Sequence, residues 1–205
     1  VPYPFELVLV DNGSSDDTSE QLAQELAKPE TAFAKSVRVE INQGYGYGIL
    51  QGLKAATAPV LAWSHADLQT PVVDIFRAYE KLQGLSVKSL VKGHRQKRPP
   101  AQEIITFGMQ TIATAILWKR LVDINAQPKV FPRALYELFN RPPHDFSLDL
   151  FLYYLALKEG FAVETIEVNF GERVFGQSKW AFNLKSKSKH IAKTIQYIAQ
   201  LRLGL

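Results

Sequence analysis

Three polar residues follow directly on an apolar run in the middle of the chain. Residues 59–63 are apolar, and His65, Asp67 and Gln69 come next. Ligands of α/β sheets bind beyond the carboxyl ends of the strands, so these residues are candidates for a site. Asp67 and Gln69 are two residues apart, which turns both side chains to one side in extended backbone. Their oxygen atoms suit a hard cation such as Mg2+ or Mn2+ together with substrate phosphates.

The same turn also has a purely structural interpretation. Thr70 is of a type that caps helix N-termini, and Pro71 suits a first helical turn. Asp67 would then serve to cap the helix that follows. The residues alone leave both roles open.

These residues lie within an alternation of strands and helices. Apolar runs predict strands at 5–10, 36–41, 59–63 and 86–91, with helices at 19–28, 45–57 and 71–82. This alternation favours an α/β fold with a mainly parallel sheet flanked by helices. Farther along, the pattern predicts helices at 102–120 and 146–158, a strand at 161–170 and a helix from 183 onward.

A glycine run separates one strand from the next helix. Gly44, Gly46 and Gly48 stand where a dinucleotide-binding turn would have its glycines, but Ile49 occupies the position of the third glycine of that motif. The spacing therefore fails for a dinucleotide. The glycines equally suit close packing of the helix on the sheet.

Composition limits the class of protein. The 205 residues, 46% of them hydrophobic, suffice for one well-cored domain, and no apolar run approaches the roughly 20 residues that span a bilayer. The lack of cysteine excludes a disulfide framework or a thiolate metal site. Residues 173–205 contain seven basic side chains and no acidic one. A nucleic-acid partner is not expected, because the rest of the chain has a slight excess of acid.

The C-terminal helix has an apolar and a basic side. Ile191, Ile195 and Ile198 share one face, and lysines lie around it. A basic amphipathic helix of this kind suits a membrane surface. Alternatively, the isoleucines pack on the rest of the protein and the lysines are solvated.

The segment 92–100 is also basic, and its two terminal prolines predict a loop.

Four motifs follow one another along the chain: VDNGS at 10–14, NQGYG at 42–46, HADLQ at 65–69 and RVFGQSK at 173–179. Together they resemble the family 2 glycosyltransferases, and among these the dolichol-phosphate-mannose-synthase-like enzymes that act on polyprenyl phosphates. The resemblance covers nearly the whole chain. It implies a GT-A fold, a nucleotide-diphosphate sugar donor, a divalent ion (Mg2+ or Mn2+) and inverting transfer of one sugar to a lipid-phosphate or glycan acceptor.

The resemblance also implies roles for individual residues. Asp11 matches the carboxylate that contacts the nucleoside, and Asn12 and Gly44 stand in motifs expected to bind the donor. Asp67 matches the last acid of the family's D-x-D metal motif, and Gln69 matches the glutamine that follows it.

His65 departs from the family, which has an acid at this position. The exchange removes one negative charge, so it either weakens metal binding or favours a metal that accepts imidazole.

Arg173, Ser178 and Lys179 match the loop that closes over the phosphates. Arg173 is expected to stabilise the negative charge that builds on the leaving diphosphate.

Two further residues are expected near the acceptor. Asp149 matches the position of a general base, which an acceptor hydroxyl requires. A lipid phosphate is already ionised at neutral pH and requires none, so Asp149 could equally be an exposed helix acid. Arg95, in the basic segment, is expected to bind phosphate beside a lipid-phosphate acceptor.

The resemblance finally bears on domains and location. The strand at 5–10 resembles the family's second strand, so the GT-A fold is expected to lack its first strand. Residues 1–180 would form the catalytic domain and 181–205 a basic amphipathic helix, in the cytoplasm at the inner face of the cytoplasmic membrane. Two other functions stay open, namely a non-catalytic nucleotide-sugar-binding protein and a transferase with a soluble saccharide acceptor.

Overall fold

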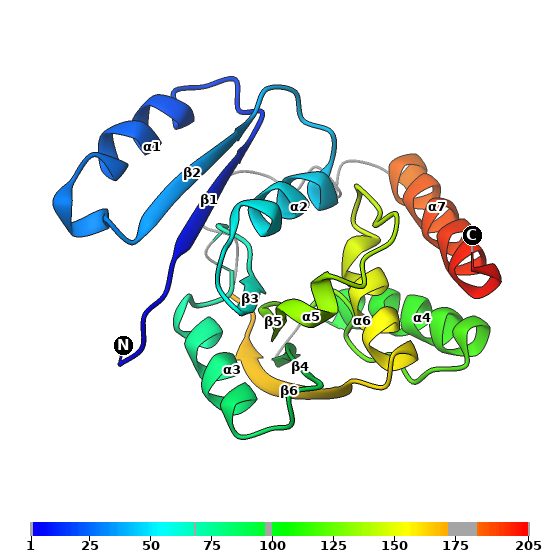
Figure 1. Cartoon of the computed structure of the whole chain (residues 1–205). Coiled ribbons are helices and arrows are strands. Elements are labelled where there is room, and N and C mark those ends of the chain that lie inside the picture. The colour runs from blue at the N-terminus through cyan, green and yellow to red at the C-terminus, as the bar shows by residue number, and fades with distance from the viewer. Residues whose placement is uncertain (1, 68, 97–99, 172–183, 205) are drawn as a thin grey trace. The chain divides into compact units, whose positions relative to one another are not determined.

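The computed structural model describes residues 2–67, 69–96, 100–171 and 184–204, with side chains except at 100–106 and 184–190. Strands and helices alternate along most of this length (Figure 1). In chain order the elements are β1 (Leu7–Asn12), α1 (Thr18–Leu26), the 3-10 helix η1 (Pro29–Thr31), β2 (Ala34–Val39), α2 (Tyr45–Ala55), β3 (Val60–Trp63), α3 (Val73–Gln83), β4 (Ser89–Gln96), α4 (Pro100–Leu117), β5 (Lys129–Pro132), α5 (Arg133–Tyr136), α6 (Leu148–Lys158), β6 (Ala162–Asn169) and α7 (Leu184–Leu203).

The chain forms two compact units, one of residues 1–61 and 133–148 and the other of 62–132 and 149–205. In the first unit, β1 and β2 pair in parallel over their whole length. Helix α2 packs on β1 so closely that a Cβ at Gly52 would lie 2.9 Å from the Val10 side chain. The division into residues 1–180 and 181–205 stays a prediction.

The other strands form a four-stranded sheet in the order β3-β5-β4-β6. Strands β4 and β6 are parallel from Ser89, opposite Ala162, to Gln96, opposite Asn169. The mainly parallel sheet flanked by helices is thus confirmed. Strand β5 is antiparallel to β4, and it was not expected, because the segment around it shows no regular pattern.

Helices α4, α6 and α7 share an apolar core in the second unit. Its buried members are Ala113, Leu117, Leu121, Leu150, Tyr153 and Ile198. Ile198 is fully buried, so at this position the apolar side of α7 packs on the protein, which was the alternative to a membrane-facing role. Over the described residues, no helix combines the length and hydropathy that crossing a bilayer requires.

The prediction of a loop at 92–100 is wrong for residues 92–96, which belong to β4. Lys92 is fully buried there, and its ammonium group donates to the carbonyls of Gly93 and Val122 at 2.9 and 3.1 Å. Gly93 is required for close approach, since a Cβ on it would lie 1.9 Å from the Gln127 carbonyl oxygen. The basic composition of this segment was therefore not a reliable sign of solvent exposure.

Candidate active site

Asp11 lies near the end of β1 and is buried with three polar partners. It accepts hydrogen bonds from the Ser19 hydroxyl, from the Ser14 backbone N–H at 3.0 Å and from Arg38 Nη1 at 2.8 Å. The bonds from Ser19 and Ser14, with the Arg38 charge, lower the pKa of Asp11 to about 2. The carboxylate is therefore ionised at neutral pH and fixed in place. Arg38 also lines a surface hollow of about 310 Å³, and Gln43 is among the other residues that line this hollow.

Asn12 and Gly44 meet beside Asp11. The Asn12 amide donates to the Gly44 carbonyl at 3.0 Å, and a Cβ at Gly48 would lie 3.0 Å from the Asn12 amide. Asn12 Oδ1 is buried and has no hydrogen-bond partner among the described residues. The first unit thus brings together three residues expected at the donor site.

The glycine run serves close packing at the start of α2. Gly44 has a φ of +119°, and a Cβ on it would lie 2.4 Å from the His144 carbonyl oxygen. A Cβ on Gly46 would meet the Pro143 carbonyl oxygen at 2.5 Å. The Tyr45 ring stacks on Phe146 at 4.7 Å. The packing interpretation is confirmed for Gly48, which lies against Asn12 of β1, whereas Gly44 and Gly46 pack on residues 143–145 and not on the sheet.

The polar turn after β3 belongs to the second unit. His65 Nδ1 lies 3.9 Å from Asp67 Oδ2, and Asp67 Oδ1 accepts the Gln69 backbone N–H at 3.2 Å. The Gln69 amide donates to the Gly171 carbonyl at 3.1 Å, and the Gly171 N–H donates back to the Gln69 carbonyl at 2.8 Å. The turn is therefore fastened to the residue that follows β6.

The helix-capping interpretation of this turn is wrong. Helix α3 begins at Val73, and its N-cap residue is Val72, which makes no side-chain cap hydrogen bond. Thr70 is buried, and the Asp67 carboxylate bonds within its own turn instead. Asp67 thus has no capping role that would account for it.

The distance from His65 Nδ1 to Asp67 Oδ2 is 3.9 Å, within the limit of about 4.2 Å for two ligands that lie about 2.1 Å from one ion. Neighbouring ligands of an octahedral ion lie about 3.0 Å apart, so the two side chains would have to move closer together to hold one. The described residues contain no group of three acidic or histidine side chains able to hold a metal. An ion at this turn would therefore need further oxygen ligands, such as those of a diphosphate.

Asp149 is not an exposed helix acid. Its carboxylate is buried in α6 and accepts hydrogen bonds from Lys129 Nζ at 2.9 Å and from the Gln127 amide at 3.0 Å. Lys129 is fully buried as well and also donates to the carbonyls of Ile124 and Ala126. Burial lowers the pKa of Lys129, and the Asp149 charge opposes that shift.

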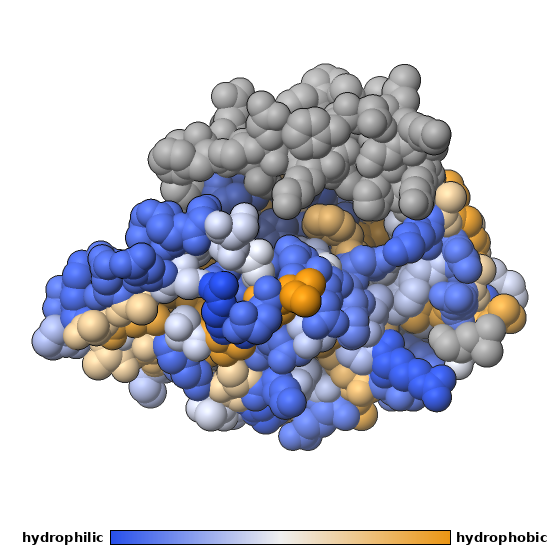
Figure 2. Space-filling model, turned by 90° about the horizontal axis from the view of Figure 1, so that it is seen from above, coloured by the Kyte–Doolittle hydropathy of each residue, from blue (hydrophilic) through white to orange (hydrophobic). Residues whose placement is uncertain are grey.

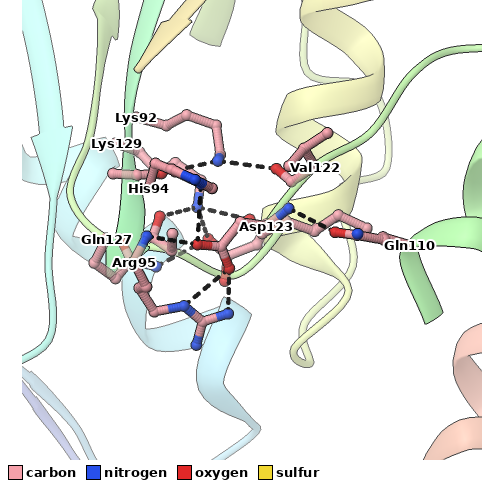
Figure 3. Close-up of polar contacts among 12 residues, drawn as sticks. Lys92, His94, Arg95, Gln110, Val122, Asp123, Gln127 and Lys129 are labelled. Carbon is pink, nitrogen blue, oxygen red and sulfur yellow. Dashed lines mark hydrogen bonds and ion pairs between the residues drawn. The ribbon is translucent and has the colours of Figure 1, made fainter. Parts of the chain in front are cut away.

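A second set of contacts joins β4 to the segment before β5, as Figure 3 shows. Arg95 pairs with the buried Asp123, and His94 Nδ1 lies 3.7 Å from the same carboxylate. Sequence reasoning singled out Arg95 but missed Asp123, Lys92 and Lys129. A local signal existed only for Asp123, a charged residue between the apolar Val122 and Ile124. Arg173, Ser178 and Lys179 lie outside the described residues.

Raising the pH is expected to stabilise the protein relative to a Lys92→Met variant. Burial, and next the charge of Lys129, lower the pKa of Lys92 from 10.5 to about 7. Between these values the unfolded chain binds the proton and the folded chain does not, so Lys92 makes stability rise with pH by at most about 1.4 kcal/mol per unit. Below about pH 7 both states are protonated, and this contribution is constant at its least favourable value.

Urea unfolding of both proteins between about pH 6 and about pH 10 measures this difference. The free energy of unfolding of the parent should gain on that of the variant above about pH 7. A gap between the two proteins that is independent of pH would contradict a lowered pKa at Lys92.

Comparison with known proteins gives a family match and close curated relatives. The model of the family described as glycosyl transferase family 2 matches residues 2–110. An undecaprenyl-phosphate 4-deoxy-4-formamido-L-arabinose transferase of Pectobacterium carotovorum is 30% identical over 187 residues, which cover 87% of this chain and 54% of that protein. The enzyme of the same name from Photorhabdus laumondii is 32% identical over 186 residues, with the same coverage. The chain spans about half the length of these relatives.

Solved structures show the same fold at lower identity. Glucosyl-3-phosphoglycerate synthase from Mycobacterium tuberculosis in complex with uridine diphosphate superposes with a TM-score of 0.71 at 16% identity, covering 98% of this chain and 69% of that one. The same enzyme with Mn2+, UDP-glucose and phosphoglyceric acid gives a TM-score of 0.69 at 14% identity, with the same coverage. The expected GT-A fold is confirmed by this likeness.

Proposed function

This chain belongs to glycosyl transferase family 2, and from that membership we propose that it moves a sugar, with inversion, from a nucleotide-diphosphate donor to a polyprenyl phosphate. The curated relatives are named for transfer to undecaprenyl phosphate, and the structural neighbours were crystallised with uridine diphosphate or its glucose conjugate. In this proposal the anchored Asp11 contacts the nucleoside, and Asn12 Oδ1 accepts a hydrogen bond from it.

The surroundings of Asp149 are the observation on which we base the proposed acceptor. A hydroxyl acceptor needs a base within hydrogen-bond reach of its proton. The Asp149 carboxylate is 1% exposed and is occupied by Lys129 and Gln127, which suits a structural ion pair better than proton transfer. A phosphate acceptor is already an anion at neutral pH and needs no base. The buried Asp149 therefore favours a lipid phosphate over a saccharide hydroxyl.

The chemistry that this proposal requires is stabilisation of negative charge. A divalent ion held by His65 and Asp67, with oxygens of the donor, would neutralise charge that builds on the departing diphosphate. By the family resemblance, Arg173 and Lys179 would add positive charge. Arg95 would bind phosphate, and its fixed position in β4 makes it a preformed anion site.

Transfer to a lipid phosphate is expected in a screen of donors and acceptors. The chain is incubated with UDP-, GDP- or dTDP-sugars, with Mg2+ or Mn2+, and with either a short polyprenyl phosphate or soluble saccharides. Mass spectrometry should detect a lipid-phosphate sugar with one donor, and its anomeric configuration should be inverted. Donor binding without transfer would indicate a non-catalytic binding protein, and product only with saccharides would overturn the lipid-phosphate acceptor.

The exposed side of α4 supports a membrane surface as a partner. Phe107 and Ile112 are exposed on this helix, and Trp118 just beyond its end is 76% exposed. The Arg202 guanidinium lies 4.2 Å from the centre of the Trp118 ring. Water-facing helix sides normally carry charge, whereas aromatic residues beside basic ones are typical of a membrane interface. In Figure 2 the apolar residues of the visible face form separate groups among hydrophilic ones.

Vesicles of anionic lipid are expected to recruit the protein at low salt, and a Phe107→Ser/Trp118→Ser variant should be recruited much less. Burying these two rings in the interface is favourable, and basic residues near an anionic surface add about 1 kcal/mol each. Flotation with anionic and neutral vesicles at two salt concentrations measures the effect. Val87→Ser, at an apolar position that is even more exposed than Phe107 and Trp118, serves as control and should float like the parent. Equal flotation of all three proteins would exclude α4 as the contact.

A further inference from the structure

Asp123 holds the side chain of Arg95 along one edge. Its carboxylate accepts the Arg95 backbone N–H at 2.7 Å, Arg95 Nε at 2.9 Å and also Arg95 Nη2. The Arg95 side chain is 13% exposed and that of Asp123 is 2% exposed. The Phe170 ring lies 5.3 Å from the guanidinium carbon. Figure 3 shows the edge of the guanidinium against Asp123, and the Phe170 ring lies on its face.

The Asp123 main chain is itself fixed from α4. Asp123 has a left-handed φ of +47°, and its backbone N–H donates to the Gln110 side-chain oxygen at 2.9 Å. The Leu121 N–H donates to the Thr114 hydroxyl at 3.1 Å. Lys92 adds its bond to the Val122 carbonyl at 3.1 Å. Three consecutive residues are therefore each tied to a side chain from α4 or β4.

The charge of Asp123 is stable over the physiological range. Burial would raise its pKa, but hydrogen bonds from Arg95 and the Arg95 charge outweigh this and lower it. An ionised Asp123 weakens the positive potential of Arg95 for any other anion. A contribution of Asp123 to anion binding must therefore come from geometry, since its charge acts in the opposite direction.

We propose that Asp123 is a positioning residue that orients Arg95 for a phosphate group. A guanidinium has five N–H donors in a planar fork, and Asp123 takes those on the Nε side. The Nη1 end then meets a phosphate in one fixed orientation, with little side-chain entropy left to lose. This inference rests on the proposed function for the identity of the anion. The phosphate is that of the lipid acceptor or of the donor diphosphate.

Binding of two probes distinguishes these sources and separates geometry from charge. Pyrophosphate stands for the donor and a short polyprenyl phosphate in detergent for the acceptor, both measured by calorimetry. Asp123→Asn should weaken one of them by about 10- to 100-fold, the range found when partners that orient a ligand group are removed. Simple electrostatics predicts the reverse, because the variant loses the negative charge that opposes the positive charge of Arg95. Equal or tighter binding of both probes by Asp123→Asn would overturn the proposal.

Coupling to Arg95 provides the second readout. Arg95→Lys keeps the charge but loses the fork, so it should weaken the same probe, and the Asp123→Asn/Arg95→Lys variant should be no weaker than Arg95→Lys alone. Additive losses would overturn the positioning role. Gln110→Ala loosens the Asp123 main chain without altering any charge and should weaken the same probe to a smaller extent. The Gln110→Ala variant tests the same proposal if Asp123→Asn fails to fold.

A matched control and the parent complete the test. Asp74 is a buried carboxylate that pairs with Arg77 at 2.6 Å outside this network, so Asp74→Asn should bind both probes like the parent. A parent that binds neither probe would overturn the proposal. A parent that binds a probe but transfers no sugar would refute the proposed enzymatic function and leave the positioning result valid.

Discussion

Asp67→Ala is expected to abolish metal-dependent binding of a nucleotide diphosphate. Asp67 is the one carboxylate in the described turn after β3, so an ion held by Asp67 and His65 would lose its charged protein ligand. Removal of a ligand should cost at least as much as removal of an outer partner of a ligand, which is about 10- to 100-fold. Calorimetry of UDP binding with Mn2+ and with EDTA measures the loss. In EDTA, the variant and the parent should bind equally weakly.

His65→Asp is the matched variant for this prediction. It restores a hard oxygen ligand, so binding in Mg2+ should be kept or strengthened. Neither change should alter the fold, because His65 and Asp67 are both partly exposed. UDP binding by Asp67→Ala as tight as that of the parent in Mn2+ would refute a metal site at this turn.

Asp149→Leu is expected to destabilise the protein by about 3 to 5 kcal/mol. The change leaves the ammonium group of Lys129 buried without its counter-ion, and breaking a buried pair from one side has costs of this size. Lys129→Met in the same background should recover most of the loss, since a buried ion pair replaced by apolar residues is often neutral. Chemical denaturation of the two single variants and the double variant gives the coupling.

The same residue discriminates a structural role from a catalytic one. Asp149→Asn keeps the shape and one hydrogen-bond acceptor, so a structural pair predicts loss of stability with the transfer rate kept in the folded fraction. A general base predicts a large fall in rate with little change in the free energy of unfolding. Glu159→Leu, an exposed acid just beyond α6, is the control and should alter neither quantity.

The turn at Asp67 could be predicted because its signal is local. An apolar run that ends in polar residues marks the end of a strand whatever the rest of the chain does. The same holds for Asp11 and for the alternation of elements, whose boundaries differ from those predicted by a few residues. Asn12 and Gly44 also lie together, as shared motifs of a donor site suggested.

The buried charges could not be predicted in this way. Lys92 and Lys129 look like solvent-exposed residues to any local pattern, because their partners are carbonyls and a carboxylate supplied by the fold. Asp149 is 20 residues away from Lys129 in the chain. The predicted capping role of Asp67 is wrong for a related reason. The Asp67 carboxylate accepts a hydrogen bond within its own turn, and α3 begins at Val73, later than predicted.

The contact between Gly93 and Gln127 restricts how this protein can vary. The Gly93 N–H also donates to the Pro128 carbonyl at 2.9 Å, so β4 and the segment before β5 touch backbone to backbone. No side chain can be inserted at position 93 unless residues 127–128 take another path. We therefore expect these two stretches to vary together, so that relatives that replace the glycine carry a changed length or sequence around 127. A chimaera that exchanges only one of the two stretches should fail to fold, whereas exchange of both together should succeed.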